Sequence, residues 1–331
     1  MTFERQGQVM GTSDMRHNSA AAEFSTVEEL QEDVRSVGWY VDYRQISKGR
    51  YCSEHASLAG AEISLMSVNF KVRLQIAASG APEGYIGFLL PRIASAEVTM
   101  LGTALTDGAL VFCPAGSEMD FVVSDGAANE TIWVPEDEFL AIARALAPSE
   151  TSSFPEAATI YQADPSRFAP LRREIFSMLR TGCLDTEAVS RLLAMCILWM
   201  TEASPELRTE QLGNGRAAAI ARKAQAFIES NYQNKIRLED LCTYTEVGSR
   251  TLQRCFASYF QMGAFEYIKV RRLNAVRRAL LAADPSYSSV TNIAISKGLS
   301  HLGRFSADYR AYFGESPRET LAARKSIVSV Q

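Results

Sequence analysis

Two stretches decide the fold of the C-terminal third of this chain: LEDLCTYTEVGSRTLQRCF at residues 238–256 and SVTNIAISKGLSHLGRFSADYRAYF at residues 289–313. Each has the pattern of a short amphipathic helix, a turn that contains glycine, and a second helix with aromatic residues on one face and arginine on the other. Proteins that insert a helix into the major groove of DNA commonly use this arrangement. The repeat therefore predicts two helix-turn-helix units, at about 238–259 and about 289–313.

In the first unit, Gly248 is expected at the turn and Ser249 as the cap of the helix that follows. Leu252 and Phe256 are four positions apart, so they should face the core of the domain. The opposite face of this helix then carries long polar side chains that can reach base edges and phosphates. These side chains are Arg250, Gln253 and Arg254.

The second unit repeats this pattern, with Gly298 at the turn. Ile293, Ala294, Phe305 and Tyr309 are expected inside. The N-terminal end of its second helix, which is the end that enters the groove in helix-turn-helix proteins, carries four candidate contact residues. They are His301, Leu302, Gly303 and Arg304.

The formal net charge of −4 conceals an uneven distribution along the chain. Residues 216–331 hold 18 Lys and Arg against 9 Asp and Glu, whereas residues 1–215 hold 16 against 29. A basic module on an acidic body fits attraction to a phosphate backbone that is confined to one end of the molecule.

Residues 220–324 resemble the DNA-binding domain of AraC/XylS-type bacterial transcription regulators. The runs that carry the resemblance are SRTLQRCF at 249–256, RRLNAVRRAL at 271–280, GLSHLGRFSADYR at 298–310 and FGESP at 313–317. RLNAVRR and HLGRFSADYR are similar to the ethanolamine-utilisation regulator branch in particular. The resemblance implies a seven-helix domain whose two recognition helices, about 34 Å apart, enter adjacent segments of the major groove on one face of DNA.

The resemblance also implies roles for individual residues. Base contacts would come from Ser249, Arg250, Gln253 and Arg254 in the first unit, and from His301, Leu302, Gly303 and Arg304 in the second. Lys297 and Arg310 would contact phosphates, which position a protein on DNA without specifying sequence. The chain departs from the common family pattern at Gly248, Leu299 and Ala307. Because Ala307 replaces a frequent arginine, the second helix is expected either to contact fewer bases or to rely on apolar contact with thymine methyl groups. Four arginines of the 264–282 helix are expected simply to solvate that helix: Arg271, Arg272, Arg277 and Arg278.

The N-terminal half has the alternation and turn spacing of short strands between residues 39 and 134. A helix is expected from Pro135 onward, because the first turn is acidic. The stretches at 106–126 and 133–139 resemble the cupin-like sensory barrel found in many of these regulators. The predicted fold is therefore α+β and multidomain, with a cupin-like antiparallel β-barrel before an all-α DNA-binding domain.

The expected domain organisation begins with a flexible tail at 1–24, a sensory domain at 25–150 and a helical pair at 151–203. A linker at 204–215 and the DNA-binding domain at 216–325 follow. In the helical pair, Leu192, Ile197 and Met200 lie on one apolar stripe. Two interpretations stay open for this stripe, which are packing against the barrel and a homodimer seam.

Neither a cofactor nor a metal is expected. The chain has three histidines, and a metal-binding cupin would need two or three of them clustered with a carboxylate. A small effector is expected in the barrel instead. The candidate contacts are Tyr43, Arg44, Arg50 and Arg73, two of which flank a stretch that could hold an anionic ligand.

The sequence as a whole predicts a DNA-binding transcription regulator, preferentially an activator, controlled by a small effector. The expected partners are double-stranded promoter DNA, RNA polymerase and a second copy of the chain, in the cytoplasm and away from the membrane. No catalytic residue is predicted. The alternatives are an enzyme with a cupin-like domain and a helical docking module, or a nonspecific DNA-binding protein, whose affinity would collapse with salt.

Overall fold

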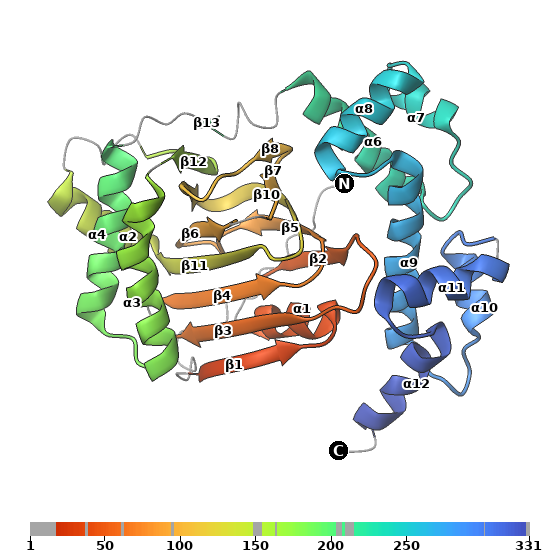
Figure 1. Cartoon of the computed structure of the whole chain (residues 1–331), viewed down its shortest axis with the longest axis horizontal. Helices are drawn as coiled ribbons and strands as arrows, with labels where there is room; N and C mark the ends of the chain where they lie inside the picture. Colours follow the sequence, from red (N-terminus) through yellow and green to blue (C-terminus); the bar gives the residue numbers. More distant parts are fainter. Residues whose placement is uncertain are drawn as a thin grey trace.

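The computed structural model describes residues 18–36, 39–60, 63–93, 96–147, 154–162, 164–202, 207–208, 215–300 and 302–328. An N-terminal half with two β-sheets and flanking helices stands beside a helical C-terminal half (Figure 1). The predicted division into a sheet domain and a helical domain is thus confirmed.

The N-terminal half contains two antiparallel sheets. The larger one has the order β1 (Asn18–Phe24), β3 (Ser53–Ala59), β4 (Ser64–Phe70), β11 (Ala128–Pro135), β6 (Tyr85–Arg92), β9 (Ala109–Cys113), β12 (Thr159–Gln162) and β13 (Leu207–Arg208). The smaller one has the order β2 (Val41–Gln45), β5 (Leu74–Gly80), β10 (Ala115–Val123), β7 (Val98–Met100) and β8 (Thr103–Ala104).

The expected barrel is not closed. Among the described strands, no pairing joins the two ends of either sheet. The larger sheet is instead buried on both faces, because successive side chains along its strands belong to two different apolar clusters. Met66 and Trp133 face the smaller sheet's cluster, and Leu65 and Ile132 face the helices. A sheet with two covered faces forms the middle of a layered structure.

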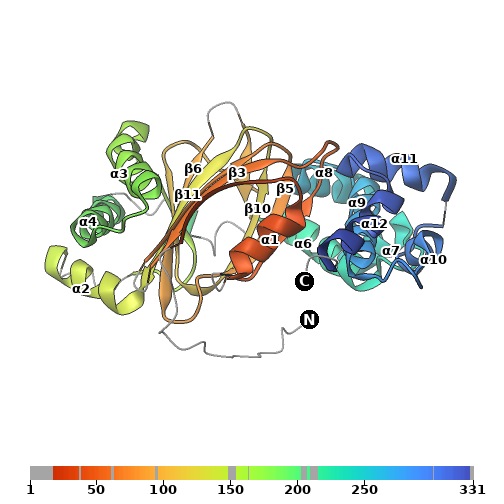
Figure 2. The same ribbon diagram turned by 90° about the horizontal axis from the view of Figure 1, so that it is seen from below.

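The helices α2 (Glu136–Leu146), α3 (Phe168–Thr181) and α4 (Thr186–Glu202) form a layer on the outer face of the larger sheet (Figure 2). As predicted, α2 begins directly after Pro135 with an acidic first turn. Gly182 ends α3 in the left-handed conformation, with φ of 66°, as its position between the two predicted helices required. The short helix η1 (Pro165–Arg167) precedes α3, and α1 (Val27–Ser36) lies beside the smaller sheet.

The stripe at Leu192, Ile197 and Met200 belongs to the core between this helical layer and the larger sheet. These side chains are 0%, 0% and 6% exposed. Packing against the sheet is therefore the interpretation that the structure favours, and the three residues do not form a surface seam. Periodicity could not separate the alternatives, because a helix that packs on a sheet and a helix that packs on a second chain have the same apolar stripe.

Two other expected segments differ in part from the structure. Residues 18–24 of the expected tail form β1, which pairs with β3 along its full length, while residues 1–17 lie outside the described part. Within the expected linker, residues 207–208 form β13 against β12, while residues 204–206 and 209–214 lie outside the described part.

The C-terminal half consists of α6 (Arg216–Asn231), α7 (Leu238–Thr245), α8 (Ser249–Phe260), α9 (Ala264–Ala282), α10 (Val290–Ser296), α11 (Leu302–Phe313) and α12 (Pro317–Val328). These helices share one apolar core, which also takes in Ile46 and Val122 from the N-terminal half. We refer to α7 and α8 as the first helix pair and to α10 and α11 as the second helix pair. The long helix α9 connects them (Figure 1).

Candidate nucleic-acid interface

The helix α8 presents one polar face to solvent. Leu252 and Phe256 are fully buried, as the spacing predicted. Ser249, Arg250, Gln253 and Arg254 are exposed, so the four predicted base contacts of the first helix pair lie together on the outer face of one helix. Side chains in this arrangement can enter a groove without unpacking the domain core.

The turn of the first helix pair differs from the expectation in detail. The residue in the left-handed conformation is Glu246, with φ of 59°, rather than Gly248, which has φ of −70°. Gly248 takes the N-cap position, and Ser249 is the first residue of α8, with no side-chain cap. The turn is closed by the N–H of Val247, which donates to the carbonyl of Cys242 at 3.2 Å.

The turn of the second helix pair requires glycine at position 298, whereas the turn of the first helix pair does not require glycine. Gly298 has φ of +84°, and a Cβ at this position would lie 2.7 Å from the carbonyl oxygen of Tyr232 and 2.8 Å from that of Gln233. Only glycine fits both the conformation and the space. Beyond the turn, Phe305 and Tyr309 are buried as predicted, and α11 begins at Leu302.

The outer face of α11 carries the remaining predicted base contacts. Gly303 and Arg304 are exposed and Leu302 is half-buried, while His301 lies outside the described residues. The two candidate phosphate contacts differ from each other. Arg310 is exposed and lies 3.3 Å from the carboxylate of Glu319, whereas Lys297, which is half-buried at the end of α10, makes no ion pair within the described part of the chain.

Three of the predicted base contacts are arginines. In the part of the chain that the structure describes, Arg250, Arg254 and Arg304 form no ion pair. An exposed guanidinium without a carboxylate partner is available for bidentate hydrogen bonds to guanine or phosphate.

Comparisons with known proteins agree on this part of the chain. The helix-turn-helix domain family matches residues 241–323. The XylDLEGF operon transcriptional activator 2 of Pseudomonas putida is 36% identical over 99 residues, which cover 30% of this chain and 63% of that protein. The crystal structure of a probable AraC family transcriptional regulator from Rhodopseudomonas palustris is 33% identical and covers 32% of this chain and 97% of that one, with a TM-score of 0.30.

Over these residues the chain is thus similar to AraC-family and XylDLEGF-operon regulators, and we refer to its C-terminal helical half as the AraC/XylS domain after this similarity. The AraC-like transcriptional activator CuxR covers 84% of this chain and 100% of its own, at 13% identity and a TM-score of 0.40. The chain spans 63% of the length of the first Pseudomonas putida relative and 32% of a second.

Each of the four arginines on α9 of the AraC/XylS domain binds an acceptor in the described part of the chain, although the side chain of Arg278 is still 38% exposed. Arg271 pairs with Glu229 at 2.7 Å, and Arg278 pairs with Asp42 at 2.6 Å. Arg277, with a side chain only 6% exposed, lies between Glu28 at 2.9 Å and Glu315 at 2.6 Å. Arg272 donates to the carbonyls of Tyr232 and Asn234. The arginines at 277 and 278 therefore attach the AraC/XylS domain to the N-terminal half.

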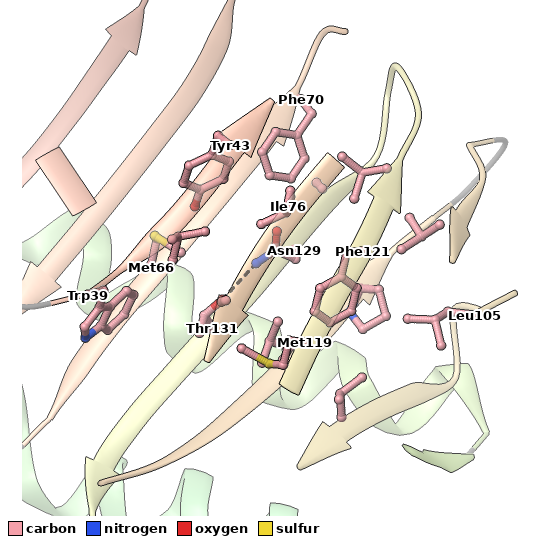
Figure 3. A pocket seen from close by; sticks show the side chains of 18 of the residues that line it. Trp39, Tyr43, Met66, Phe70, Ile76, Leu105, Met119, Phe121, Asn129 and Thr131 are labelled. Atoms are coloured by element: carbon pink, nitrogen blue, oxygen red, sulfur yellow. Dashed lines mark hydrogen bonds between the residues drawn. The ribbon is translucent and has the colours of Figure 1, made fainter. Parts of the chain in front are cut away.

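A cavity lies between the two sheets of the N-terminal half (Figure 3). Its free space of about 70 Å³ is several times that needed by one water molecule. Most of its lining is apolar, and the labelled side chains in Figure 3 come from both sheets. The lining includes Trp39, Val41, Tyr43, Met66, Phe70, Ile76, Ala78, Met119, Phe121, Val123, Asn129, Thr131 and Trp133.

Of the predicted effector contacts, the structure places only Tyr43 at this cavity. Arg44 points to the other face of β2, where it bonds to Asp42 and Glu229. Arg50 is exposed beside Gly314 of the C-terminal half, and Arg73 is not among the lining residues. An anionic ligand in this cavity would meet no arginine from this set.

Sequence reasoning missed most of the cavity, although one signal was present. Met119, Phe121 and Val123 alternate along β10 and all face the cavity. Trp39 and Trp133 of the lining pack edge to face with their ring centroids 4.9 Å apart. This pair could not be predicted from the sequence, because the two residues are far apart in the chain.

Among the described residues, no group of three or more His, Cys, Asp and Glu side chains could hold a metal ion. No helix in the described part is long and apolar enough to span a membrane.

Proposed function

We propose that this protein is a sequence-specific transcription activator that binds promoter DNA with both helix pairs and responds to a small effector held in the N-terminal cavity. One observation carries the proposal. Two helices, α8 and α11, each combine a buried aromatic face with an exposed arginine that has no ion pair in the described part of the chain. Relatives of this domain are named as operon activators, which supports the regulator over the enzyme hypothesis.

The spacing of the two helices supports the same proposal. The connecting helix α9 has 19 residues, which at about 1.5 Å per residue gives a length of roughly 28 Å. A helix of this length between the pairs suits recognition helices that enter the groove about one turn of DNA apart, roughly 34 Å. Both pairs would then act as helix-turn-helix units on one face of the duplex.

The proposal also includes a homodimer, contact with RNA polymerase, a cytoplasmic location and membership of the ethanolamine-utilisation branch. A dimer that used the helical layer would have to use exposed side chains, such as Leu198 on α4 or Phe176 on α3, which are 41% and 40% exposed. Light scattering of wild type and of Leu198→Glu would show whether this face pairs two chains.

Binding of the purified chain to the intergenic DNA upstream of its own gene, compared with scrambled DNA of the same length at near-physiological salt, tests the main proposal. We expect a preference of about a thousandfold or more for the native DNA. Arg254→Ala and Arg304→Ala should each weaken binding by about 1–3 kcal/mol. Arg173→Ala, which removes an exposed arginine from α3, is the matched control and should have no effect.

The alternatives predict other results. A nonspecific DNA-binding protein would bind both DNAs equally and lose affinity steeply with salt. An enzyme with a docking module would keep its turnover in the Arg254→Ala and Arg304→Ala variants. Binding to neither DNA would contradict the proposal, unless binding appeared once an effector was added.

A further inference from the structure

The strands β2, β5 and β10 form a single layer that separates the cavity from the AraC/XylS domain. Successive side chains of a strand point to opposite faces of its sheet. In this layer Tyr43, Ile76 and Phe121 are register partners across the three strands, and all three line the cavity. One face of the layer is therefore the wall of the cavity.

The next row of register partners faces the AraC/XylS domain. This row consists of Arg44, Gln75 and Val122. Arg44 pairs with Glu229 of α6. Gln75 accepts a hydrogen bond from the hydroxyl of Tyr267 on α9 at 3.0 Å, and Val122 is part of the apolar core of the C-terminal half.

Asp120 lies between the cavity and the AraC/XylS domain. It lies on β10 between Met119 and Phe121, which both line the cavity. Its carboxylate accepts hydrogen bonds from Gln75 at 3.1 Å and from the hydroxyl of Tyr259 on α8 at 3.3 Å. A shift of this strand by a fraction of an ångström would change the contact with α8, because hydrogen bonds weaken steeply with distance and angle.

The same layer also holds the second helix pair. The side-chain amide of Gln45, the last residue of β2, donates to the carbonyl of Tyr312 on α11. The N–H of Gly49, in the loop that follows β2, donates to the carbonyl of Ala311 at 2.9 Å. Asn274 of α9 donates to the backbone carbonyl of Gln45 at 2.9 Å. One sheet thus contacts both helix pairs and the helix that connects them.

The lining of the cavity limits the chemistry of its ligand. None of the described residues that line it is charged, and burial of a carboxylate or an ammonium group without a partner is strongly unfavourable. Asn129 and Thr131 bond to each other at 2.8 Å. Trp133 also lines the cavity, and its indole N–H is buried without a hydrogen-bond partner in the described part of the chain, so an acceptor on a ligand that reached this group would satisfy it.

We propose that the cavity binds a neutral, largely apolar molecule with a hydrogen-bond acceptor, and that this ligand changes how the β2–β5–β10 layer holds both helix pairs. The inference rests on the proposed function in one respect, because it assigns the ligand class and the route of regulation to the effector site named there. The route runs through one layer of backbone, with a cavity contact and a docking contact on neighbouring residues of the same strand.

The ligand class is tested by titration calorimetry of the full chain with 2-octanone and with octanoate at pH 8. The two probes have the same chain length, but one is a neutral acceptor and the other an anion. We expect 2-octanone to bind at least tenfold more tightly. Ala78→Phe, which fills the cavity from β5, should weaken binding of 2-octanone at least tenfold, and Val41→Phe serves if that variant does not fold. Stronger binding of octanoate, or no binding of either probe, would overturn the ligand class.

The route is tested by hydrogen exchange of the same protein with and without 2-octanone. We expect the exchange of amides in α8 and α9 to change several-fold when the probe binds. Tyr259→Phe removes a hydroxyl on the docking side and leaves the cavity lining intact, so it should keep the affinity for 2-octanone and lose most of the response in α8. A response confined to the N-terminal half of the wild type would overturn the route.

These two experiments do not depend on DNA. If the protein bound no specific DNA but passed both tests, the proposed function would fail and the ligand site with its route would stand. If it bound its promoter specifically but failed both tests, the reverse would hold. Adding 2-octanone to the promoter-binding titration then shows whether the two properties are coupled, because a ligand alters DNA affinity only through different affinities for the two states.

Discussion

Asp120 provides a pH test of the contact between the two halves of the protein. Its side chain is buried in that contact, and burial raises its pKa from 3.8 to about 6, although hydrogen bonds from Gln75 and Tyr259 act in the opposite direction. The change Asp120→Asn keeps the shape of the side chain and removes its charge. An amide can still accept from Gln75, and its NH₂ group can donate to the hydroxyl of Tyr259.

The sign and size of the effect follow from the pKa difference. A carboxyl group whose folded pKa is raised stabilises the fold while it is protonated, and this stability is lost as the pH rises from the unfolded pKa through the folded pKa. The full difference between 3.8 and about 6 corresponds to about 3 kcal/mol. About half of this, roughly 1.5 kcal/mol, falls between pH 5 and pH 8. The Asn variant should therefore gain stability relative to wild type by that amount over this range.

Urea unfolding at pH 5, 6, 7 and 8, followed by tryptophan fluorescence, measures the difference between variant and wild type. Glu118→Gln is the matched control, since Glu118 is on the same strand but has a side chain 64% exposed beside Arg222. Its stability difference should stay constant within a few tenths of a kcal/mol. If the Asp120→Asn difference were equally flat, the buried carboxylate would be ionised at every pH tested, and the argument from burial would be refuted.

Three further predictions concern the C-terminal half. Gly298→Ala should destabilise the protein by more than 1 kcal/mol, because it combines positive φ with a Cβ 2.7 Å from the Tyr232 carbonyl. Gly248→Ala has negative φ and open space around it, so its stability should stay close to that of wild type when both variants are compared by thermal unfolding. Equal losses of stability in the two variants would contradict the assignment of the turn. Arg277→Met should cost about 2 kcal/mol, because it leaves the two carboxylates that bind the guanidinium without their partner; an unchanged unfolding midpoint would show that this contact is dispensable. Affinity for promoter DNA should fall linearly on a logarithmic salt scale, and removal of one phosphate contact should reduce the slope by about 1; a slope unchanged in Lys297→Ala would exclude that lysine as a phosphate contact.

Most of the C-terminal half could be predicted from the sequence. The helix α9 has the same bounds as predicted, because the spacing of its apolar positions is a local signal. Leu252 and Phe256 are buried and Arg250 and Arg254 are exposed for the same reason, since helical spacing alone fixes which side chains share a face. The turn before α8 was assigned to the wrong residue, because Gly248 is a plausible turn residue by composition and Glu246 is not.

The N-terminal half could be predicted only in outline. Alternation identified strands, but the closure of a barrel depends on which strands pair, and strands such as β11 and β4 are about 60 residues apart in the chain. The effector contacts show the same limit. Tyr43 and Arg44 are neighbours on β2 and face opposite sides of the sheet. Which of the two lines a cavity depends on what packs against each face. Arg277 and Arg278 of α9 were assigned to a solvated helix face because their partners Glu28 and Asp42 lie more than 200 positions earlier.

The sequence by itself determined the helical domain, its two helix pairs and the exposed faces that carry the candidate DNA contacts. These features depend on interactions between residues three or four apart, on glycine at turns and on charge, all of which are local. The tertiary structure alone decided that the apolar stripe of α4 is core, that Arg277 and Arg278 of α9 hold the N-terminal half, and that one three-stranded layer separates a cavity from the DNA-binding domain. The physical reason is that burial and ion pairing depend on which distant segments meet, and one sequence pattern is compatible with several such partners until the chain is folded.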